Sequence, residues 1–461
     1  MDKSKIKSII TGQPEQGVPG LQNDWWTFIA PDIWNSHGSF IHDTSGTDYL
    51  DMCGFLSTAP VRFDHPRLRD DSLILHFGRI AMYRPSLSDF WTEEMAEFVQ
   101  TFRTHATPPY MHHYFFIDGG ALAVENALKA AFDWKVRLNI QKGLISHDPQ
   151  EELTPLGTKV LYFENGFHGR SGYTLSLTHT HDPNKYKYYP KFEWYKIDPP
   201  VLRFDFTGEI QNRDEVLRKE KEALAGVRKI LESKSDDIAA IIVEPVQCEG
   251  GDRHIPESFF VSLRKLADTF DVILIYDEVQ TGFGTTSKMW AHEHFGKEAV
   301  PDVIVFSKKS QVGGIMANFE RFSKVKDNVF GKGAPSKSRI NSTWGGNLVD
   351  MMRCTFFLQI INEEKLLDNA ARAGEILLEG LRHLCRRHAD HIENPRGRGC
   401  LLAIDARTPE LKTNLWKKFY DEHFLCLTCG SRTLRFRPHL DVTESEIGLA
   451  LETMERVLKK L

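Results

Sequence analysis

The sequence predicts an α/β protein built around a mostly parallel sheet. Short apolar runs recur along the chain, and each is followed by a turn and a longer segment whose apolar residues have helical spacing. The runs are apolar at nearly every position, which is typical of strands covered on both faces. They are YFFI at 114–117, KVLYF at 159–163, AAIIVE at 239–244, VILIYDE at 272–278 and VIVF at 303–306.

The two ends of the chain differ from this pattern. Residues 1–75 are rich in aromatic residues, glycine and proline, whereas residues 346–461 read as two helices, short strands and a last helix. The chain has 461 residues, more than one core comfortably uses. We therefore expect a large domain over residues 76–345 and a smaller α+β domain that residues 1–75 and 346–461 form together.

Composition favours small-molecule chemistry. The net charge is -5, and lysine and arginine are spread along the chain without a basic block, so nothing indicates nucleic-acid or membrane binding. The longest apolar runs are far shorter than the roughly 20 residues that cross a bilayer. The first residues, MDKSKIKSII, lack the apolar region of a secretory signal, so we expect a cytoplasmic protein.

The seven cysteines are scattered along the chain, and their odd number and low density favour reduced thiols. Cys426 and Cys429 form a CxxC pair, but the sequence offers no second pair or nearby histidine cluster that would complete a zinc site. We expect structural thiols and no metal.

Ligands of parallel sheets bind at the carboxyl ends of the strands. The run at 114–117 leads into Gly119, Gly120 and Ala121, and the apolar residues at 124, 127, 128, 131 and 132 fit one face of a helix that starts there. A glycine turn at a helix start exposes backbone N–H groups that can bind a phosphate. An ordinary strand-to-helix turn is the alternative.

A second loop, after the run at 159–163, combines Phe167, His168 and Arg170 around glycines. This combination offers an aromatic stacking face and a guanidinium that can bind a carboxylate. Arg170 taken alone would be a surface charge, so the prediction depends on the cluster.

Asp277 and Lys308 each end an apolar run, where a charge is costly without a partner. They are 31 positions apart, one strand–helix–strand step, so they reach the same sheet edge if their strands are neighbours. A helix N-cap is the alternative for Asp277. A desolvated lysine is a nucleophile for aldehydes, and with an Asp, an aromatic ring and a phosphate seat it meets the needs of pyridoxal phosphate. Lys309 is expected to be solvated or paired elsewhere.

These segments match a known family. The set GGALAVENALK, FHGR, EPVQCEGG, YDEVQTGFG, FSKK, STWGGN and LRFRP, in this order, resembles the class III pyridoxal-phosphate aminotransferases of fold type I, over residues 35 to 455. FHGRSGYTLSLT and KKSQVGG are most similar to L-lysine 6-aminotransferases. The resemblance implies a mostly parallel seven-stranded sheet, a homodimer, and ping-pong transfer of the terminal amino group of L-lysine to 2-oxoglutarate, giving 2-aminoadipate 6-semialdehyde and L-glutamate.

The resemblance also implies roles for residues. Lys308 corresponds to the Schiff-base lysine and Asp277 to the partner of the pyridine nitrogen. The other cofactor-binding residues are Phe167 and Val279 on the two ring faces, His168, Gln280 at the phenolic oxygen and also near the substrate, Gly119, Gly120 and Ala121 at the phosphate, and Thr343 contributed to the phosphate by the other subunit.

Substrate binding follows from the same resemblance. Glu244 and Arg435 correspond to a pair that bind each other while lysine is present and separate so that Arg435 takes the α-carboxylate of 2-oxoglutarate. Arg170 is implied to bind the distal carboxylate of either substrate.

Three alternatives remain open at this point. One is another ω-aminotransferase, for 4-aminobutyrate or ornithine, with the same fold. Another is a non-catalytic dimeric binding protein that keeps the fold without the chemistry. A dinucleotide-binding oxidoreductase is disfavoured, because no GxGxxG follows an early strand.

Overall fold

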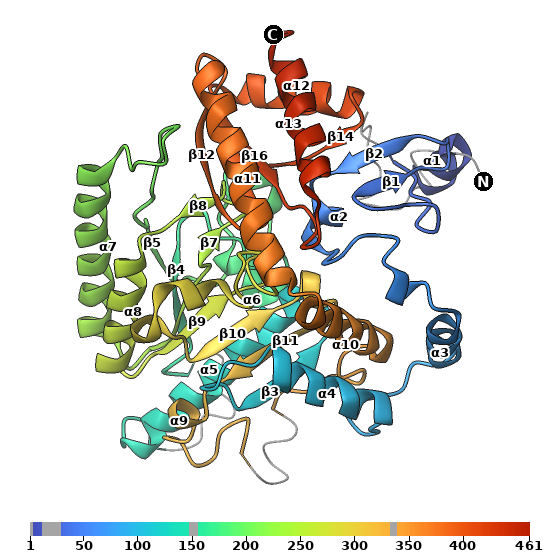
Figure 1. Cartoon of the computed structure of the whole chain (residues 1–461). Helices are drawn as coiled ribbons and strands as arrows, with labels where there is room; N and C mark the ends of the chain where they lie inside the picture. Colours follow the sequence, from blue (N-terminus) through green and yellow to red (C-terminus); the bar gives the residue numbers. More distant parts are fainter. Residues whose placement is uncertain (1–2, 12–28, 147–154, 332–338) are drawn as a thin grey trace.

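The computed structural model describes residues 3–11, 29–146, 155–331 and 339–461. Its centre is a seven-stranded sheet with the strand order β3-β11-β10-β9-β6-β4-β5 (Figure 1). Strands β10, β9, β6, β4 and β5 are parallel, and β11 is antiparallel to both of its neighbours. The predicted α/β class with a mostly parallel sheet is confirmed. The strand bounds are β3 His113–Ile117, β4 Lys159–Phe163, β5 Tyr195–Ile197, β6 Ile238–Val243, β9 Ile273–Asp277, β10 Val303–Phe306 and β11 Gly313–Ala317.

Five of these strands agree with the predicted apolar runs to within a residue at each end. The other two, β5 and β11, were not expected from the sequence. β5 has three residues, and β11 begins with two glycines, which a strand seldom contains. Packing explains the second of these glycines, because a Cβ on Gly314 would lie 2.7 Å from Cζ of Phe306.

The two faces of the sheet bury alternate residues of each strand. On β6, Ala240 and Ile242 belong to the core under α5, whereas Ile241 and Val243 belong to the core under α7 and α8. Helices α4 and α10 cover the β3, β11 and β10 part of that second face. The helix bounds are α4 Glu93–His105, α5 Gly120–Gln141, α7 Arg213–Lys234, α8 Glu257–Thr269 and α10 Leu348–Glu363.

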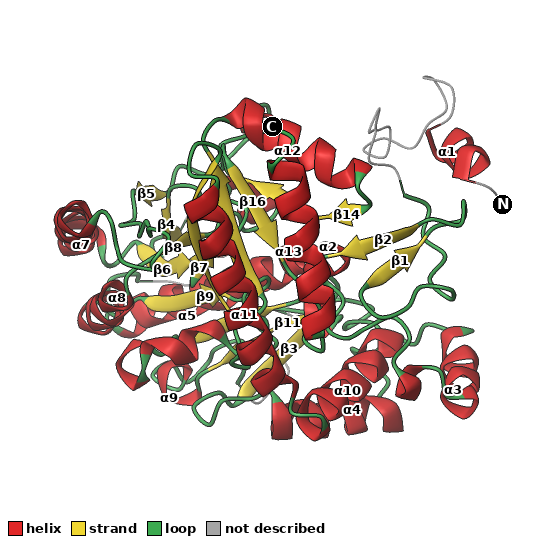
Figure 2. Cartoon of the chain, turned by 45° about the horizontal axis from the view of Figure 1, so that its top comes forward, coloured by secondary structure: helices red, strands yellow, loops and turns green. Residues whose placement is uncertain are grey.

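The C-terminal part has its own antiparallel sheet, of order β12-β13-β16-β15, and a separate core that includes residues of α11, α12 and α13 (Figure 2). The N-terminal part joins it, because β2 pairs in parallel with β14 and antiparallel with β1. The domain boundaries at 75 and 345 stay a prediction. The bounds are β1 Phe40–His42, β2 Asp48–Asp51, α11 Leu366–Arg387, β12 Ile392–Arg398, β13 Leu401–Ala406, α12 Pro409–Asp421, β14 Phe424–Leu425, β15 Leu427–Cys429, β16 Thr433–Phe436 and α13 Glu444–Leu458.

Shorter elements complete the fold. They are α1 Lys3–Thr11, α2 Gly54–Ser57, α3 Asp71–Ala81, α6 Gly172–Leu177, the two-stranded β7 Val246–Gln247 and β8 Arg253–His254, and α9 Phe319–Phe322. Within the described ranges, none of the helices has the length and apolar character that a bilayer crossing needs. The cytoplasmic location stays a prediction.

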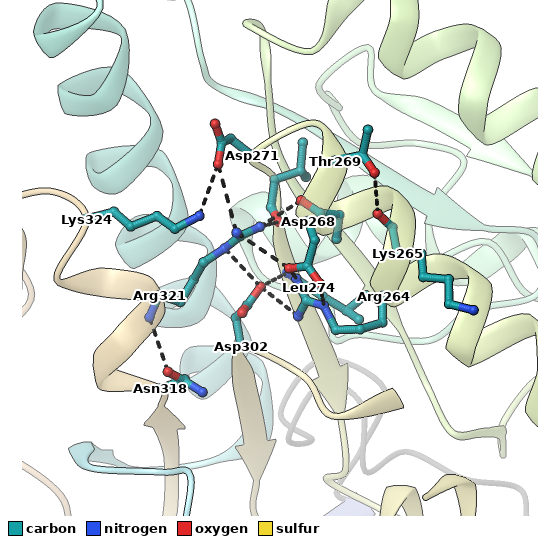
Figure 3. Close-up of polar contacts among 12 residues, drawn as sticks. Arg264, Lys265, Asp268, Thr269, Asp271, Leu274, Asp302, Asn318, Arg321 and Lys324 are labelled. Carbon is teal, nitrogen blue, oxygen red and sulfur yellow. Dashed lines mark hydrogen bonds and ion pairs between the residues drawn. The ribbon is translucent and has the colours of Figure 1, made fainter. Parts of the chain in front are cut away.

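A buried ionic cluster joins the amino ends of β9 and β10 (Figure 3). Asp302, directly before β10, accepts a hydrogen bond from Leu274 N at 2.8 Å and lies 3.5 Å from Arg321 Nε. Nη2 of Arg321 donates to the carbonyl oxygens of Ala267 (2.7 Å) and Val272 (2.6 Å). One guanidinium therefore binds both the end of α8 and the start of the two strands that carry Asp277 and Lys308.

We expect Arg321→Ala to lower the free energy of unfolding by about 3–5 kcal/mol, because the buried carboxylate of Asp302 loses one of its two guanidinium partners and the carbonyls of Ala267 and Val272 lose the donor that they share. Urea denaturation followed by circular dichroism measures the loss. Lys324→Ala is the control, since this half-exposed lysine pairs with Asp271 at the surface and its removal should cost about 0–1 kcal/mol. Equal losses in the two variants would contradict the role given to Arg321.

Candidate active site

The site is built where β9 and β10 end side by side. The two strands are parallel neighbours, and Val305 lies opposite Asp277 in their register. Lys308 follows three residues after Val305, so the carboxylate and the amine reach the same edge of the sheet. The sequence predicted that Asp277 and Lys308 reach the same sheet edge if their strands are neighbours, and the two strands are neighbours.

The carboxylate of Asp277 is fixed by two contacts. Its Oδ2 lies 2.8 Å from Nδ1 of His168, and its Oδ1 accepts a hydrogen bond from Val279 N at 3.1 Å. The side chains of Asp277 and His168 are both buried. A carboxylate has about four acceptor positions, so Asp277 retains the capacity to bind one more donor, such as a protonated ring nitrogen.

The N-terminus of α5 lies beside this pair. Gly119 has a φ of +83° and caps the helix without a side-chain hydrogen bond, which leaves first-turn N–H groups for a ligand. A Cβ on Gly120 would lie 2.8 Å from Cγ1 of Val279 and 3.5 Å from Cβ of Ser307. The predicted phosphate turn is therefore in close contact with the residues that follow β9 and β10.

The loop after β4 packs against the same helix start. A Cβ on Gly169, which has a φ of +128°, would lie 2.7 Å from Cβ of Ala121. Phe167 is half-buried in this loop, and the guanidinium of exposed Arg170 lies 6.0 Å from the centroid of its ring. The loop that carries Phe167 and His168 and the phosphate turn thus form two adjoining walls.

Glu244 does not have the partner that was expected. Its Oε1 accepts a hydrogen bond from Phe167 N at 2.9 Å, and its Oε2 accepts one from Cys248 N at 3.2 Å. Burial, followed by the negative charge of Asp277, raises the pKa of Glu244 well above its ordinary value. Both of its oxygens face backbone N–H groups, so Glu244 connects the end of β6 to the Phe167 loop.

Arg435 pairs with a different glutamate, which corrects the expected Glu244–Arg435 pair. Its Nη2 lies 2.7 Å from Oε2 of Glu249, and its Nη1 donates to Oε1 of Gln280 at 3.0 Å. Lys185 Nζ lies 2.5 Å from the other oxygen of Glu249. Burial alone would raise the pKa of Glu249, but Arg435 and Lys185 lower it overall. The residues therefore form a chain of alternating charge that ends at Gln280.

Lys308 has a strained backbone and a perturbed amine. Its φ is +55°, in the region that favours glycine. Burial, followed by the positive charge of Arg435, lowers the pKa of its amine below the ordinary value. Nζ donates to the carbonyl oxygen of Leu56 at 3.4 Å. An amine with a lowered pKa is a better nucleophile at neutral pH.

Lys309 was expected to be either solvated or paired elsewhere, and it is paired elsewhere. It is 1% exposed, and its Nζ donates to the carbonyl oxygen of Ala59 at 3.0 Å.

Thr343 is exposed, and its carbonyl accepts a hydrogen bond from Ser86 Oγ at 2.6 Å. Across the described part of the chain, no hydrogen bond or ion pair joins the Thr343 side chain to Lys308 or Asp277.

Two residues of the site, Glu249 and Lys185, were missed in the sequence. Glu249 lies in a turn closed by hydrogen bonds from Gly251 N and Asp252 N to the carbonyl of Cys248. The segment QCEGG gave a usable indication, because it predicts a loop and binding residues often lie on loops. Lys185 lies about 60 positions away, in the short 3-10 helix Pro183–Lys185, and carries no such indication.

The residues present fit pyridoxal phosphate. The glycine turn of α5 offers N–H groups for the phosphate, Asp277 has unused acceptor capacity for the ring nitrogen, and Lys308 offers an amine with a lowered pKa for the aldehyde. Val279 and Gln280 lie two and three residues after Asp277, and Val279 touches the phosphate turn.

Comparisons with known proteins give the same assignment. The aminotransferase class-III family matches residues 24–458. The L-lysine-epsilon aminotransferase of Mycobacterium tuberculosis is 41% identical over 432 residues, which cover 93% of this chain and 92% of that protein. The human mitochondrial 4-aminobutyrate aminotransferase is 32% identical and covers 92% of this chain and 83% of its own.

A solved structure supports the fold. The lysine aminotransferase of M. tuberculosis superposes with a TM-score of 0.90 at 38% identity, and the match covers 100% of both chains. The ω-transaminase of Pseudomonas jessenii, at 23% identity and a TM-score of 0.75, shares the fold. With a family match over nearly the whole chain and a site that suits the coenzyme, this protein belongs to the class III aminotransferases, which are pyridoxal-phosphate-dependent transaminases of fold type I.

Proposed function

We propose that the enzyme transfers the terminal amino group of L-lysine to 2-oxoglutarate, which yields 2-aminoadipate 6-semialdehyde and L-glutamate. The observation that carries this proposal is the ion pair of Arg435 with Glu249, 2.7 Å apart, in the buried surroundings of Lys308. A donor that reacts through its terminal amine brings no carboxylate to this arginine, so a glutamate must neutralise it. The identity to L-lysine-epsilon aminotransferases over nearly the whole chain supports lysine as that donor.

The bound coenzyme supplies a carbonyl carbon that reacts with amines and a ring that withdraws electrons from the neighbouring carbon. Lys308 would hold it through Nζ, Asp277 would hold its ring nitrogen, and the start of α5 would hold its phosphate. Once released, Nζ of Lys308 would take a proton from the substrate carbon that bears the reacting amine and pass it to the coenzyme carbon that carried the aldehyde, acting as base and then as acid. The lowered pKa of Lys308 increases the fraction that can act as base.

The acceptor needs the opposite arrangement around Arg435. A 2-oxo acid carries a carboxylate next to the reacting carbon, and the guanidinium can bind it with two parallel hydrogen bonds once Glu249 moves away. Lys185, 2.5 Å from Glu249, keeps this carboxylate compensated in both half-reactions, since a buried carboxylate without a partner is costly. We assign the distal carboxylate to Arg170, and its exposed guanidinium beside Phe167 supports this assignment.

An exposed apolar surface supports a homodimer. None of the residues of α3 is buried, and the segment that follows exposes Tyr83 by 85% and Trp91 by 82%. Apolar residues this exposed and this close together are typical of an interface. The same segment contacts Thr343 through the hydroxyl of Ser86. A second copy of the chain over this surface brings Thr343 to the phosphate site of its partner.

The donor can be identified with purified protein. Turnover of L-lysine, 4-aminobutyrate and L-ornithine is measured with 2-oxoglutarate as acceptor, with Lys308→Ala as the blank. We expect L-lysine to have the highest kcat/KM by at least about tenfold, a difference of roughly 1.4 kcal/mol. A higher value for 4-aminobutyrate or L-ornithine would assign the enzyme to that donor, and no turnover with any of them would contradict the proposed function.

The two half-reactions should respond differently to changes around Arg435. We expect Arg435→Gln to slow the half-reaction with 2-oxoglutarate by about a hundredfold, since it loses a charged contact with the carboxylate, and the lysine half-reaction by less than about tenfold. Single-turnover absorbance measures each half separately. Lys185→Met should slow the 2-oxoglutarate half by about tenfold, and exposed Lys187→Met is its control. Equal losses in the two halves contradict the alternating partners of Arg435.

The dimer is tested at its proposed surface. Tyr83→Asp places a charge there, and we expect dissociation at micromolar concentration and an affinity for pyridoxal phosphate at least about tenfold lower, because Thr343 of the partner is lost. Light scattering and absorbance titration measure the two effects. Tyr188→Asp, at a tyrosine that is 76% exposed elsewhere, is the matched control. A monomer that keeps full cofactor affinity is the contrary result.

A further inference from the structure

One turn of left-handed helix lies against the amine of Lys308. The four residues of α2, Gly54, Phe55, Leu56 and Ser57, have φ angles of 56°, 52°, 63° and 66°. Three of them carry side chains, for which this backbone conformation is unfavourable. Such a run persists only where the surrounding structure determines it, so the contacts of the turn indicate what it is for.

Hydrogen bonds from several elements hold this turn. The carboxylate of buried Asp51 accepts from Phe55 N at 2.7 Å and from Cys53 N at 2.9 Å. Gln311 Nε2 donates to the carbonyl of Thr58 at 2.6 Å. A Cβ on Gly54 would lie 2.2 Å from the carbonyl oxygen of Arg437, so the start of the turn is in direct contact with the strand end of the C-terminal part.

Lys308 and Lys309, which follow β10, both donate hydrogen bonds to residues 54–59, and the two bonds differ in length. Lys308 Nζ lies 3.4 Å from the carbonyl of Leu56, whereas Lys309 Nζ lies 3.0 Å from the carbonyl of Ala59. Lys308 is the group that reacts, so its amine changes partners in every cycle and cannot hold the turn throughout. The side-chain donors to the segment that stay in place are Gln311 and, next to Lys308, the buried amine of Lys309.

The surroundings of Lys309 are costly for an ammonium group. It is 1% exposed, and burial lowers the pKa of its amine to about 8, with Cys400, Arg437, Asp51 and Lys308 as the charged or titratable groups that contribute further. An apolar residue of the same volume would avoid this cost. The hydrogen bond to the carbonyl of Ala59 is therefore the reason for a buried amine at this position.

We propose that Lys309 is a positioning residue that keeps the turn from Gly54 to Ser57 fixed beside Lys308 while Lys308 changes partners. The carbonyl of Leu56 accepts from the amine at the reacting position. When Lys308 is released, the amine of the substrate occupies that position and is the donor that this carbonyl requires. A loosened turn therefore weakens binding of the amino donor. This last step rests on the proposed function, whereas the hold on the turn does not.

The chain offers a matched control in Lys135. It is also fully buried, its Nζ donates to the carbonyl of Asp271 at 2.8 Å, and burial lowers the pKa of its amine to about 8. Asp271 precedes β9, so Lys135 acts at the opposite edge of the sheet from Lys308. Lys309→Met and Lys135→Met thus remove the same kind of hydrogen bond from equally buried positions.

Hydrogen exchange of residues 52–60 in the cofactor-free protein is the first measurement. We expect exchange at least about tenfold faster in Lys309→Met, the effect of one lost hydrogen bond, and unchanged exchange of this segment in Lys135→Met. Unchanged exchange in Lys309→Met, or equal increases in both variants, overturns the proposal. If Lys309→Met does not fold, Lys309→Gln, whose donor is too short to reach Ala59, is measured with the same expectation.

Steady-state kinetics with the holoenzyme give the second measurement. Lys309→Met should raise KM for L-lysine by about tenfold, with kcat and the absorbance of bound cofactor within about twofold of the original protein. Lys135→Met should lower stability without moving KM. If residues 52–60 exchange faster in Lys309→Met but neither the original protein nor any variant turns over L-lysine, the proposed donor is rejected. The role of Lys309 in holding the turn then still stands. Normal kinetics in Lys309→Met would reject the effect of the turn on donor binding.

Discussion

The parallel pairing of β9 with β10 is the contact on which the site depends. It sets Asp277 and Lys308 at one sheet edge, one strand apart. The ionic cluster of Asp302 and Arg321 secures the same two strands at their other end. Because a strand pair is rigid along its whole length, fixing the amino ends also fixes the residues that follow the carboxyl ends. Asp277 and Lys308 therefore follow two of the most buried strands of the sheet.

Charges in the site are compensated mostly by one another. Asp277 is next to His168, and Glu244 accepts two backbone hydrogen bonds. Arg435 shares Glu249 with Lys185. In a buried region each of these groups needs a partner, and a group with two partners can exchange one of them at a lower cost. This property suits an enzyme whose two substrates present different charges to one pocket.

Backbone strain gathers around the amine of Lys308. Lys308 and Gln311 both have positive φ angles. Lys308 contacts Leu56 within the left-handed segment Gly54 to Ser57, and Gln311 contacts Thr58, which follows it. Strain of this kind is common at sites that must keep groups in fixed positions. The buried amine of Lys309 and the carboxylate of Asp51 supply the hydrogen bonds that offset it.

The sequence by itself determined the family, five of the seven strands of the central sheet and the pair of Asp277 and Lys308, because apolar runs and the charged residues that end them are local features of the chain. The tertiary structure decided which charges meet. Glu244 and Glu249 are five residues apart, and only the turn after Cys248 directs the second one to Arg435 while backbone N–H groups take the first. It also decided that Lys309 is buried, since adjacent residues of one segment can face opposite surroundings and sequence alone does not fix which.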